Sequence, residues 1–157
     1  MRLRLLGLVL AQVALVGVAV APQLLARATG EDYLMRVQPV DPIDPFRGAY
    51  VTLDYPDLQG PDGSRPSRTE DGERGELFIT LVEEDGYWVA DERTRTRPDD
   101  GPYLACDDRS WQVRCGIESY FVPQDRAREI EEALVDGGAA TVRIDSRGVA
   151  TMVSVDP

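Results

Sequence analysis

The sequence predicts a mainly β (α+β) protein, in which an N-terminal transmembrane helix precedes a small antiparallel β-rich domain with one amphipathic helix. Three observations lead to this fold class. An uncharged apolar run opens the chain, short alternating segments separated by turn residues fill most of the remainder, and one late segment has helical spacing. Residues 29–157 suffice for one domain with its own core and are too few for two.

The N-terminal segment has the pattern of a membrane anchor. Arg2 and Arg4 precede an apolar run that carries no charge from Leu5 to Ala26. A helix of this length, rising about 1.5 Å per residue, can cross the roughly 30 Å hydrocarbon core of a bilayer. A cleaved signal peptide is the alternative, because Ala19-Val20-Ala21 has the small-residue pattern of a cleavage site. Pro22 would follow that cut directly and hinder the peptidase, so the sequence favours an uncleaved anchor over residues 1–28.

Charge predicts the orientation of this anchor. The positive-inside tendency keeps Arg2 and Arg4 in the cytoplasm and exports the chain after Ala28. The predicted location is the cytoplasmic membrane, crossed once, with an extracytoplasmic domain over residues 29–157. Ala26-Arg27-Ala28 is a second candidate cleavage site, but it would require an overlong apolar region. Cleavage at either site would instead release a soluble domain.

Composition excludes several classes of function. The chain has 28 acidic against 17 basic residues and a formal charge of −11, which repels phosphate backbones and argues against a nucleic-acid partner. It contains neither histidine nor lysine, so Ser-His-Asp, Ser-Lys, Cys-His and HExxH sites are impossible. Two cysteines fall short of a zinc set, and the acidic segments 57–63 and 70–76 do not have EF-hand spacing. The sequence therefore predicts no catalytic residue, cofactor or metal site.

Alternation and turn residues predict the strands of the exported domain. The expected segments are 31–37, 49–55, 76–84, 87–92, 103–106, 111–122, 139–145 and 149–155. Asp85-Gly86 tolerates the positive φ angles of a type I′ turn and is the strongest hairpin signal. Ser146-Arg147-Gly148 separates the strands of a final hairpin.

One helix and two irregular segments complete the prediction. Pro123 favours a helix start, and Ala127, Ile130 and Leu134 then recur at helical spacing until Gly137-Gly138 ends the helix. Three prolines between residues 38 and 48 predict a rigid extended corner. Residues 56–75 contain almost nothing apolar and are predicted to form a mobile loop.

Cys106 and Cys115 are the only cysteines, and export would place them where disulfides persist. We expect them to bond to each other, because the intervening residues can form a hairpin-like return. Two free buried thiols and an intermolecular bond are the alternatives.

Two sequence blocks resemble the GDYXXLXY family of membrane-anchored bacterial proteins. The first is Gly48-Ala49-Tyr50-Val51-Thr52-Leu53-Asp54-Tyr55, with the preceding residues 40–47; the second is residues 116–123. Ala49 stands where the family usually has aspartate, so this chain lacks that carboxylate. The resemblance implies a single-pass anchor, a β-rich exported domain and frequent genetic association with multi-pass membrane proteins. It implies no known activity and no catalytic residues.

The residues of these blocks have a structural and a functional interpretation. Gly48, Tyr50, Leu53 and Tyr55 fit a glycine-led strand that fills both faces of a sheet. Trp88 and Trp111, in predicted strands, are expected in the core. The candidate interaction or site residues are Asp41, Asp44, Arg47, Glu118 and Tyr120.

The expected function is a non-enzymatic accessory or interaction domain for a membrane partner, with contact at residues 39–48. One alternative is a carboxylate-dependent hydrolase of cell-envelope material, if two of Asp41, Asp44, Asp54 and Glu118 converge as acid and base. The other is a small-ligand-binding β domain.

Overall fold

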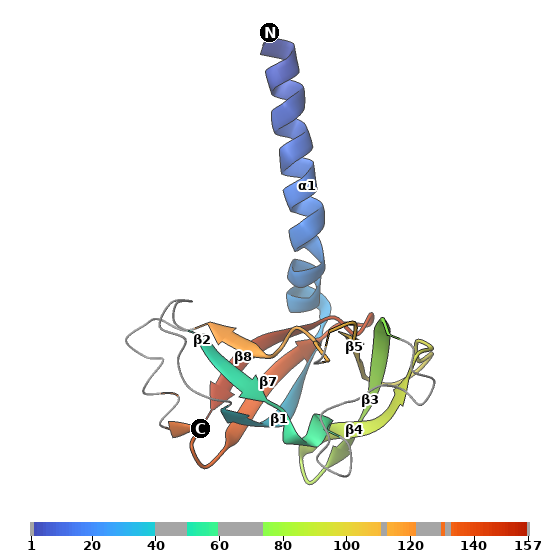
Figure 1. The fold of residues 1–157 in the computed structure, drawn as a ribbon, viewed down its shortest axis with the longest axis vertical. Coiled ribbons are helices and arrows are strands. Elements are labelled where there is room, and N and C mark those ends of the chain that lie inside the picture. Colours follow the sequence, from blue (N-terminus) through green and yellow to red (C-terminus); the bar gives the residue numbers. More distant parts are fainter. Residues whose placement is uncertain are drawn as a thin grey trace.

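The structure, a computed structural model, describes residues 2–39, 50–59, 74–110, 113–121, 130 and 133–156. One long helix stands clear of a domain built from strands (Figure 1). In chain order the elements are α1 (Arg2–Thr29), β1 (Glu31–Pro39), β2 (Tyr50–Asp54), the 3-10 turn η1 (Pro56–Leu58), β3 (Glu76–Glu84), β4 (Tyr87–Thr94), β5 (Tyr103–Asp107), β6 (Ser119–Phe121), β7 (Gly138–Ile144) and β8 (Ala150–Asp156). The predicted mainly β class is confirmed.

The strands form two antiparallel sheets. One has the order β6-β2-β1-β7-β8 and the other the order β4-β3-β5. Strand β1 lies at the centre of the larger sheet: Glu31 to Val37 pair with β7, while Gln38 and Pro39 pair with β2. The first strand of the domain is therefore held mainly by a strand more than a hundred residues further along the chain.

Both predicted hairpins form, and each turn uses the residues that the sequence indicated. Asp85 and Gly86 have φ angles of 52° and 81°, as a turn between right-twisted strands requires. In the β7–β8 turn, the Asp145 carboxylate accepts hydrogen bonds from the backbone N–H groups of Arg147 (2.9 Å) and Val149 (3.0 Å). Gly148 supplies the positive φ, 78°, that closes this turn.

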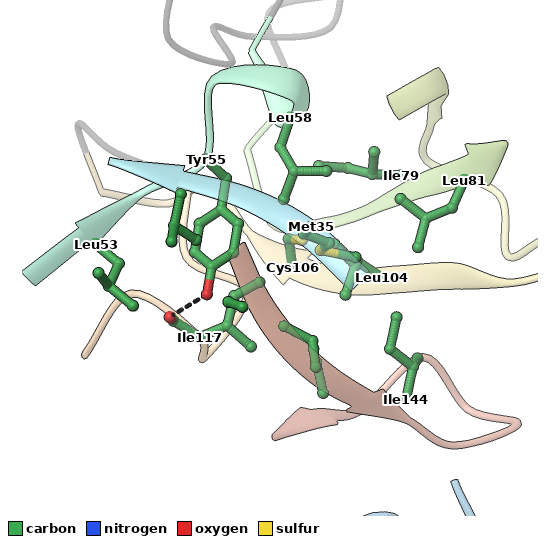
Figure 2. Packing of buried hydrophobic residues seen from close by; sticks show 14 of the residues in the cluster. Met35, Leu53, Tyr55, Leu58, Ile79, Leu81, Leu104, Cys106, Ile117 and Ile144 are labelled. Carbon is green, nitrogen blue, oxygen red and sulfur yellow. Dashed lines mark hydrogen bonds between the residues drawn. The ribbon is translucent and has the colours of Figure 1, made fainter. Parts of the chain in front are cut away.

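The core lies between the sheets and includes side chains of both (Figure 2). The largest fully buried side chains are Met35, Ile79, Leu104, Ile117, Leu134, Val37 and Val142. Leu58 of η1 joins this core, although the sequence predicted a mobile loop from Pro56 onward. Because Leu58 packs inward, residues 56–59 belong to the fold; residues 60–73 of the predicted loop lie outside the described residues.

Strand β6 is shorter than the sequence predicted, because the segment before it forms a turn. Gly116 has a φ of 84°, and the Glu118 carboxylate accepts hydrogen bonds from the Cys115 and Gly116 N–H groups. After this turn, the described residues that pair with β2 are Ser119–Phe121. Of the predicted helix, Ile130 and residues 133–136 are described; the Leu134 N–H donates to the Ile130 carbonyl, and Leu134 is fully buried.

The N-terminal helix is confirmed as a helix of 28 residues. Its apolar side chains are exposed around the shaft, among them Val9, Leu10, Val13, Leu15, Val16, Val18 and Val20. Within the described residues, none of the helices combines the length and apolar character needed to cross a membrane. The transmembrane character of α1 therefore stays a prediction.

Candidate functional site

The two sequence blocks singled out above lie side by side in the larger sheet. Strands β2 and β6 pair antiparallel, with Tyr50 opposite Phe121, Val51 opposite Tyr120 and Thr52 opposite Ser119. The Leu53 N–H then donates a 2.9 Å hydrogen bond to the Glu118 carbonyl and extends this contact beyond β6. Residues separated by more than sixty positions thus form one structural unit.

Tyr55 fixes this unit to the core. Its ring is buried, and its hydroxyl donates a 2.9 Å hydrogen bond to the Ile117 carbonyl (Figure 2). The same hydroxyl lies 3.9 Å from the Met152 sulfur on β8. Burial, with a further contribution from the negative charge of Glu118, raises the pKa of Tyr55 far above its ordinary range. Tyr55 is therefore a neutral hydrogen-bond donor with a structural role.

Glu118 supports the backbone rather than presenting a free carboxylate. Its Oε1 accepts from the N–H groups of Cys115 and Gly116, and its Oε2 accepts from Gly116 at 3.1 Å. Asp54, another predicted candidate, accepts a 2.5 Å hydrogen bond from the Gln59 side-chain amide. Both carboxylates therefore take part in local structure, Glu118 through both of its oxygens and Asp54 through Oδ2.

Cys106 and Cys115 form the predicted disulfide. Cys106 lies on β5, in the smaller sheet, whereas Cys115 lies on the segment that leads to β6, in the larger sheet. A backbone bridge between Asp107 and Arg114 lies beside it, with hydrogen bonds of 2.8 and 2.9 Å. The disulfide therefore ties the two sheets together next to the β2–β6 unit.

The remaining predicted residues divide into two groups. Tyr120 is half buried and packs against the core, and Leu53 is buried within it. Trp88 is half buried, with its ring edge-on to Tyr33 and the ring centroids 4.9 Å apart.

The other predicted residues lie outside the described part of the chain. They are Asp41, Asp44, Arg47, Gly48, Ala49 and Trp111; for Tyr50 only the backbone is described. The predicted contact segment 39–48 is thus described only at Pro39.

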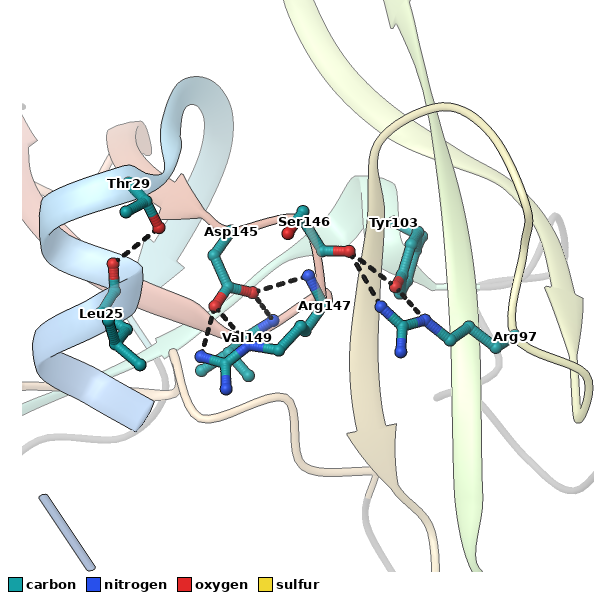
Figure 3. A network of polar contacts seen from close by, with 8 residues as sticks. All are labelled: Leu25, Thr29, Arg97, Tyr103, Asp145, Ser146, Arg147 and Val149. Atoms are coloured by element: carbon teal, nitrogen blue, oxygen red, sulfur yellow. Dashed lines mark hydrogen bonds and ion pairs between the residues drawn. The ribbon is translucent and has the colours of Figure 1, made fainter. Parts of the chain in front are cut away.

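Sequence reasoning missed a polar network that joins the two sheets (Figure 3). The Arg97 guanidinium donates to the Tyr103 hydroxyl at 2.6 Å and to the Ser146 carbonyl at 3.0 Å. The Tyr103 hydroxyl donates to the same carbonyl at 3.1 Å. No local pattern marks these residues, because Arg97 lies in a polar loop and Ser146 in a hairpin turn.

A second group, which we call the neck, joins α1 to the domain. Arg143 makes a two-pronged ion pair with Asp32 (2.6 and 2.7 Å) and donates to the Arg27 carbonyl at 3.0 Å. Arg143 thus caps the C-terminal end of α1, where a cation is favourable. Ala26 is fully buried, and its carbonyl accepts from the Gly30 N–H at 3.0 Å. The last turn of α1 is therefore packed into the domain.

Gly30 permits this close packing. A β-carbon at this position would meet the Ala26 carbonyl oxygen at 2.6 Å and the Ile144 carbonyl oxygen at 2.8 Å. The helix end thus lies directly against the end of β7. The neck and the Arg97 network are structural features that only the folded chain reveals.

The comparison with protein families supports the resemblance found in the two sequence blocks. The model of a protein family described as GDYXXLXY protein matches residues 12–155, nearly the whole chain. That range includes both blocks, the disulfide and all but the first residues of α1. No curated protein and no solved structure matches the chain.

Proposed function

The chain belongs to the GDYXXLXY family, and from that premise we propose that it is a single-pass accessory protein of the cytoplasmic membrane. In this proposal α1 is the anchor, and the β domain is an extracytoplasmic, non-enzymatic interaction module for a membrane partner. The observation that carries the proposal is the exposure of apolar side chains around α1. A helix that is apolar on all sides is stable when a membrane or another protein surrounds it.

The length of the apolar segment supports a membrane, rather than another protein, as the surroundings of α1. No charged residue lies between Leu5 and Ala26, and Arg2 and Arg4 precede the segment. The proposal rests on this sequence pattern and on the exposed side chains, because no helix among the described residues qualifies as a span. The two arginines favour a cytoplasmic N-terminus.

The neck supports retention of the anchor. Cleavage after Ala28 would remove Ala26, which is fully buried, and Arg27, whose carbonyl binds Arg143. The Arg27 side chain also donates to the Thr151 hydroxyl at 3.4 Å. A signal peptide is ordinarily separate from the mature fold, whereas this helix end contributes contacts to it.

The polar contacts of the domain favour interaction over catalysis. Glu118 and Asp54 are engaged in local hydrogen bonds, and Tyr55 is buried and neutral. Within the described residues, no group of three or more histidine, cysteine or acidic side chains is placed to hold a metal ion. Of the carboxylates considered for the hydrolase alternative, Asp54 and Glu118 thus hold local structure, and Asp41 and Asp44 lie outside the described residues.

Membrane extraction tests the anchor. Membranes from cells that produce the full chain are washed with alkaline carbonate, and we expect the protein to stay in the pellet. Leu15→Arg combined with Val18→Arg should release it, because each arginine at a helix centre costs about 2.5 to 3.5 kcal/mol on insertion. Val82→Arg, an exposed position on β3, is the matched control and should stay membrane-bound. Wild-type protein in the carbonate supernatant would contradict the proposal.

Two further measurements test orientation and partner. External protease added to spheroplasts should digest the domain, whereas a protected domain would place it in the cytoplasm. Purification of the full chain in mild detergent, followed by mass spectrometry, should give an intact N-terminus and a stoichiometric multi-pass protein. Arg47→Glu with Tyr50→Ala should abolish that co-purification without unfolding the domain; unchanged co-purification would exclude the proposed contact at residues 39–48.

A further inference from the structure

The neck determines which end of the domain faces the membrane, if α1 is the anchor proposed above. Strand β1 begins at Glu31, directly after the helix, and its antiparallel neighbour β7 ends opposite it at Ile144. The β7–β8 turn, residues 145–149, therefore projects from the end of the sheet that adjoins α1 (Figure 1). Because uncharged residues extend to Ala26, this turn lies at the depth of the lipid headgroups.

The neck holds this arrangement rigidly. Arg143 connects α1, β1 and β7 through its bonds to the Arg27 carbonyl and the Asp32 carboxylate. Gly30 leaves no room for the helix end to shift towards β7, since even a β-carbon would collide with the Ile144 carbonyl. The domain is therefore fixed on the helix rather than tethered by a flexible linker.

Two arginines lie at this end of the domain, which we call the rim. Arg97 and Arg147 flank Ser146, whose carbonyl accepts a bond from Arg97 (Figure 3). The Asp145 carboxylate points inward, with 2% of its side chain exposed, whereas the side chain of its partner Arg147 is 42% exposed. The turn therefore buries the carboxylate of this ion pair and leaves part of the arginine side chain at the surface.

We propose that Arg97 and Arg147 of the rim bind the phosphate of an anionic phosphoglyceride headgroup in the bilayer that holds α1. Each of the two guanidinium groups donates within the protein through Nε and Nη2, and within the described residues its Nη1 makes no hydrogen bond. The Nη1 group can therefore donate a charge-assisted hydrogen bond to a phosphate oxygen. Asp99 and Asp100 are exposed in the same loop as Arg97 and oppose long-range attraction. Recognition therefore depends on direct guanidinium–phosphate contact, which favours a headgroup whose phosphate is not neutralised by choline.

Native mass spectrometry of the full chain tests this lipid site. The protein is reconstituted in nanodiscs of mixed phosphatidylglycerol and phosphatidylcholine, and the ratio of the two lipids retained on the protein is measured. Wild type should retain phosphatidylglycerol preferentially. Arg97→Gln with Arg147→Gln should lower that preference by about fivefold for each arginine, as expected for a basic side chain at a lipid surface.

Arg109→Gln with Arg114→Gln is the matched control. This variant also removes two positive charges. Both side chains are exposed and follow Asp107, which ends β5, whereas Tyr103 begins that strand. The lipid preference should therefore stay unchanged. An equal loss in both double variants would mean a nonspecific charge effect and would overturn the proposal. An unchanged preference in the Arg97/Arg147 variant would also overturn it.

A gain-of-function variant keeps the test decisive if the double variant does not fold. The Ser146 side chain is exposed, and Ser146→Arg should increase phosphatidylglycerol retention; no increase would overturn the proposal. This inference rests on the proposed function, and the two fail differently. A chain that does not enter nanodiscs contradicts the anchor, whereas an inserted chain without lipid preference contradicts only the rim site.

Discussion

Gly148 lies beneath the ring of Tyr103 so closely that a β-carbon added to it would meet the ring Cε2 at 2.5 Å. The Gly148 carbonyl also accepts a 2.9 Å hydrogen bond from the Ala105 N–H. This contact joins the β7–β8 turn of the larger sheet to β5 of the smaller one. The absence of a side chain at one residue thus lets the two sheets meet.

Gly148→Ala should destabilise the domain more than the same change at Gly86. Both glycines have a positive φ, 78° and 81°, so each alanine incurs about 1 to 2 kcal/mol of backbone strain. Gly86 has open space around it, whereas Gly148→Ala adds a clash that costs a further ~1 to 3 kcal/mol. Urea unfolding of the full chain in detergent measures the loss in free energy of unfolding for both variants. Equal losses would contradict the proposed packing role of Gly148.

Tyr55→Phe should lower the free energy of unfolding by about 1 to 3 kcal/mol, because it leaves the Ile117 carbonyl without its donor in the core. Tyr33→Phe is the control, since within the described part of the chain the Tyr33 hydroxyl donates to Glu31 alone, in an exposed 3.3 Å contact. That variant should unfold with nearly wild-type stability. If the two substitutions lower the free energy of unfolding equally, the buried hydrogen bond of Tyr55 does not stabilise the domain.

Removal of the disulfide should destabilise the domain without unfolding it completely. Cys106 and Cys115 are nine positions apart, and closing so short a loop contributes about 2 to 3 kcal/mol. Cys106→Ala with Cys115→Ala should therefore lower the melting temperature, which circular dichroism measures. A reductant should lower the melting temperature of the wild type and leave that of the double variant unchanged. If the reductant lowers both melting temperatures equally, it does not act through this disulfide.

Acid should weaken the domain through the Arg95–Asp108 pair. Hydrogen bonds from Arg95 (2.5 and 3.1 Å), assisted by the Gly75 N–H and opposed by burial, lower the pKa of Asp108 from its ordinary value of 3.8. Because the folded-state pKa lies below the unfolded one, this stabilisation is complete above about pH 4 and is lost as the pH falls through the folded value.

Asp108→Asn tests this assignment. It should cost about 1 to 3 kcal/mol at neutral pH, since an amide replaces the carboxylate that accepts from Arg95 and Gly75. The difference from wild type should shrink below pH 4, which urea unfolding at a series of pH values would measure. Asp91→Asn, at an exposed position on β4, should leave the wild-type pH profile unchanged. A constant difference between Asp108→Asn and wild type across the acid range would contradict the assignment.

Gly30→Ala should loosen the neck. The added β-carbon would meet two backbone oxygens within 2.8 Å, and backbone atoms cannot rotate away as a side chain can. The Gly30 N–H bond to the Ala26 carbonyl should weaken, so hydrogen exchange of residues 27–32 should accelerate. Gly17→Ala, in open space on α1, should exchange at the wild-type rate in that segment.

Part of the candidate site could be predicted from the sequence, because it depends on local pattern. The alternation of residues 49–55 identified strand β2, and two lone cysteines identified the disulfide. The pairing of β2 with β6 could not be predicted, since alternation identifies the two faces of a strand and does not identify its partner strand. Glu118 illustrates the limit: as a candidate carboxylate it suggested chemistry, and only its bonds to the Cys115 and Gly116 N–H groups assign it to a turn.

The sequence by itself determined the N-terminal helix, the mainly β class, both hairpins with their turn residues, and the disulfide. The helix, the strands and the hairpins follow from hydrophobic periodicity and turn chemistry over a few neighbouring residues, and the disulfide follows from the presence of just two cysteines. The tertiary structure alone decided that β1 pairs with β7, that Arg143 closes the neck on α1, and that Arg97 and Tyr103 meet Ser146. These contacts join residues 43 to 116 positions apart, and such partners are selected by packing of the whole domain, which no local pattern encodes.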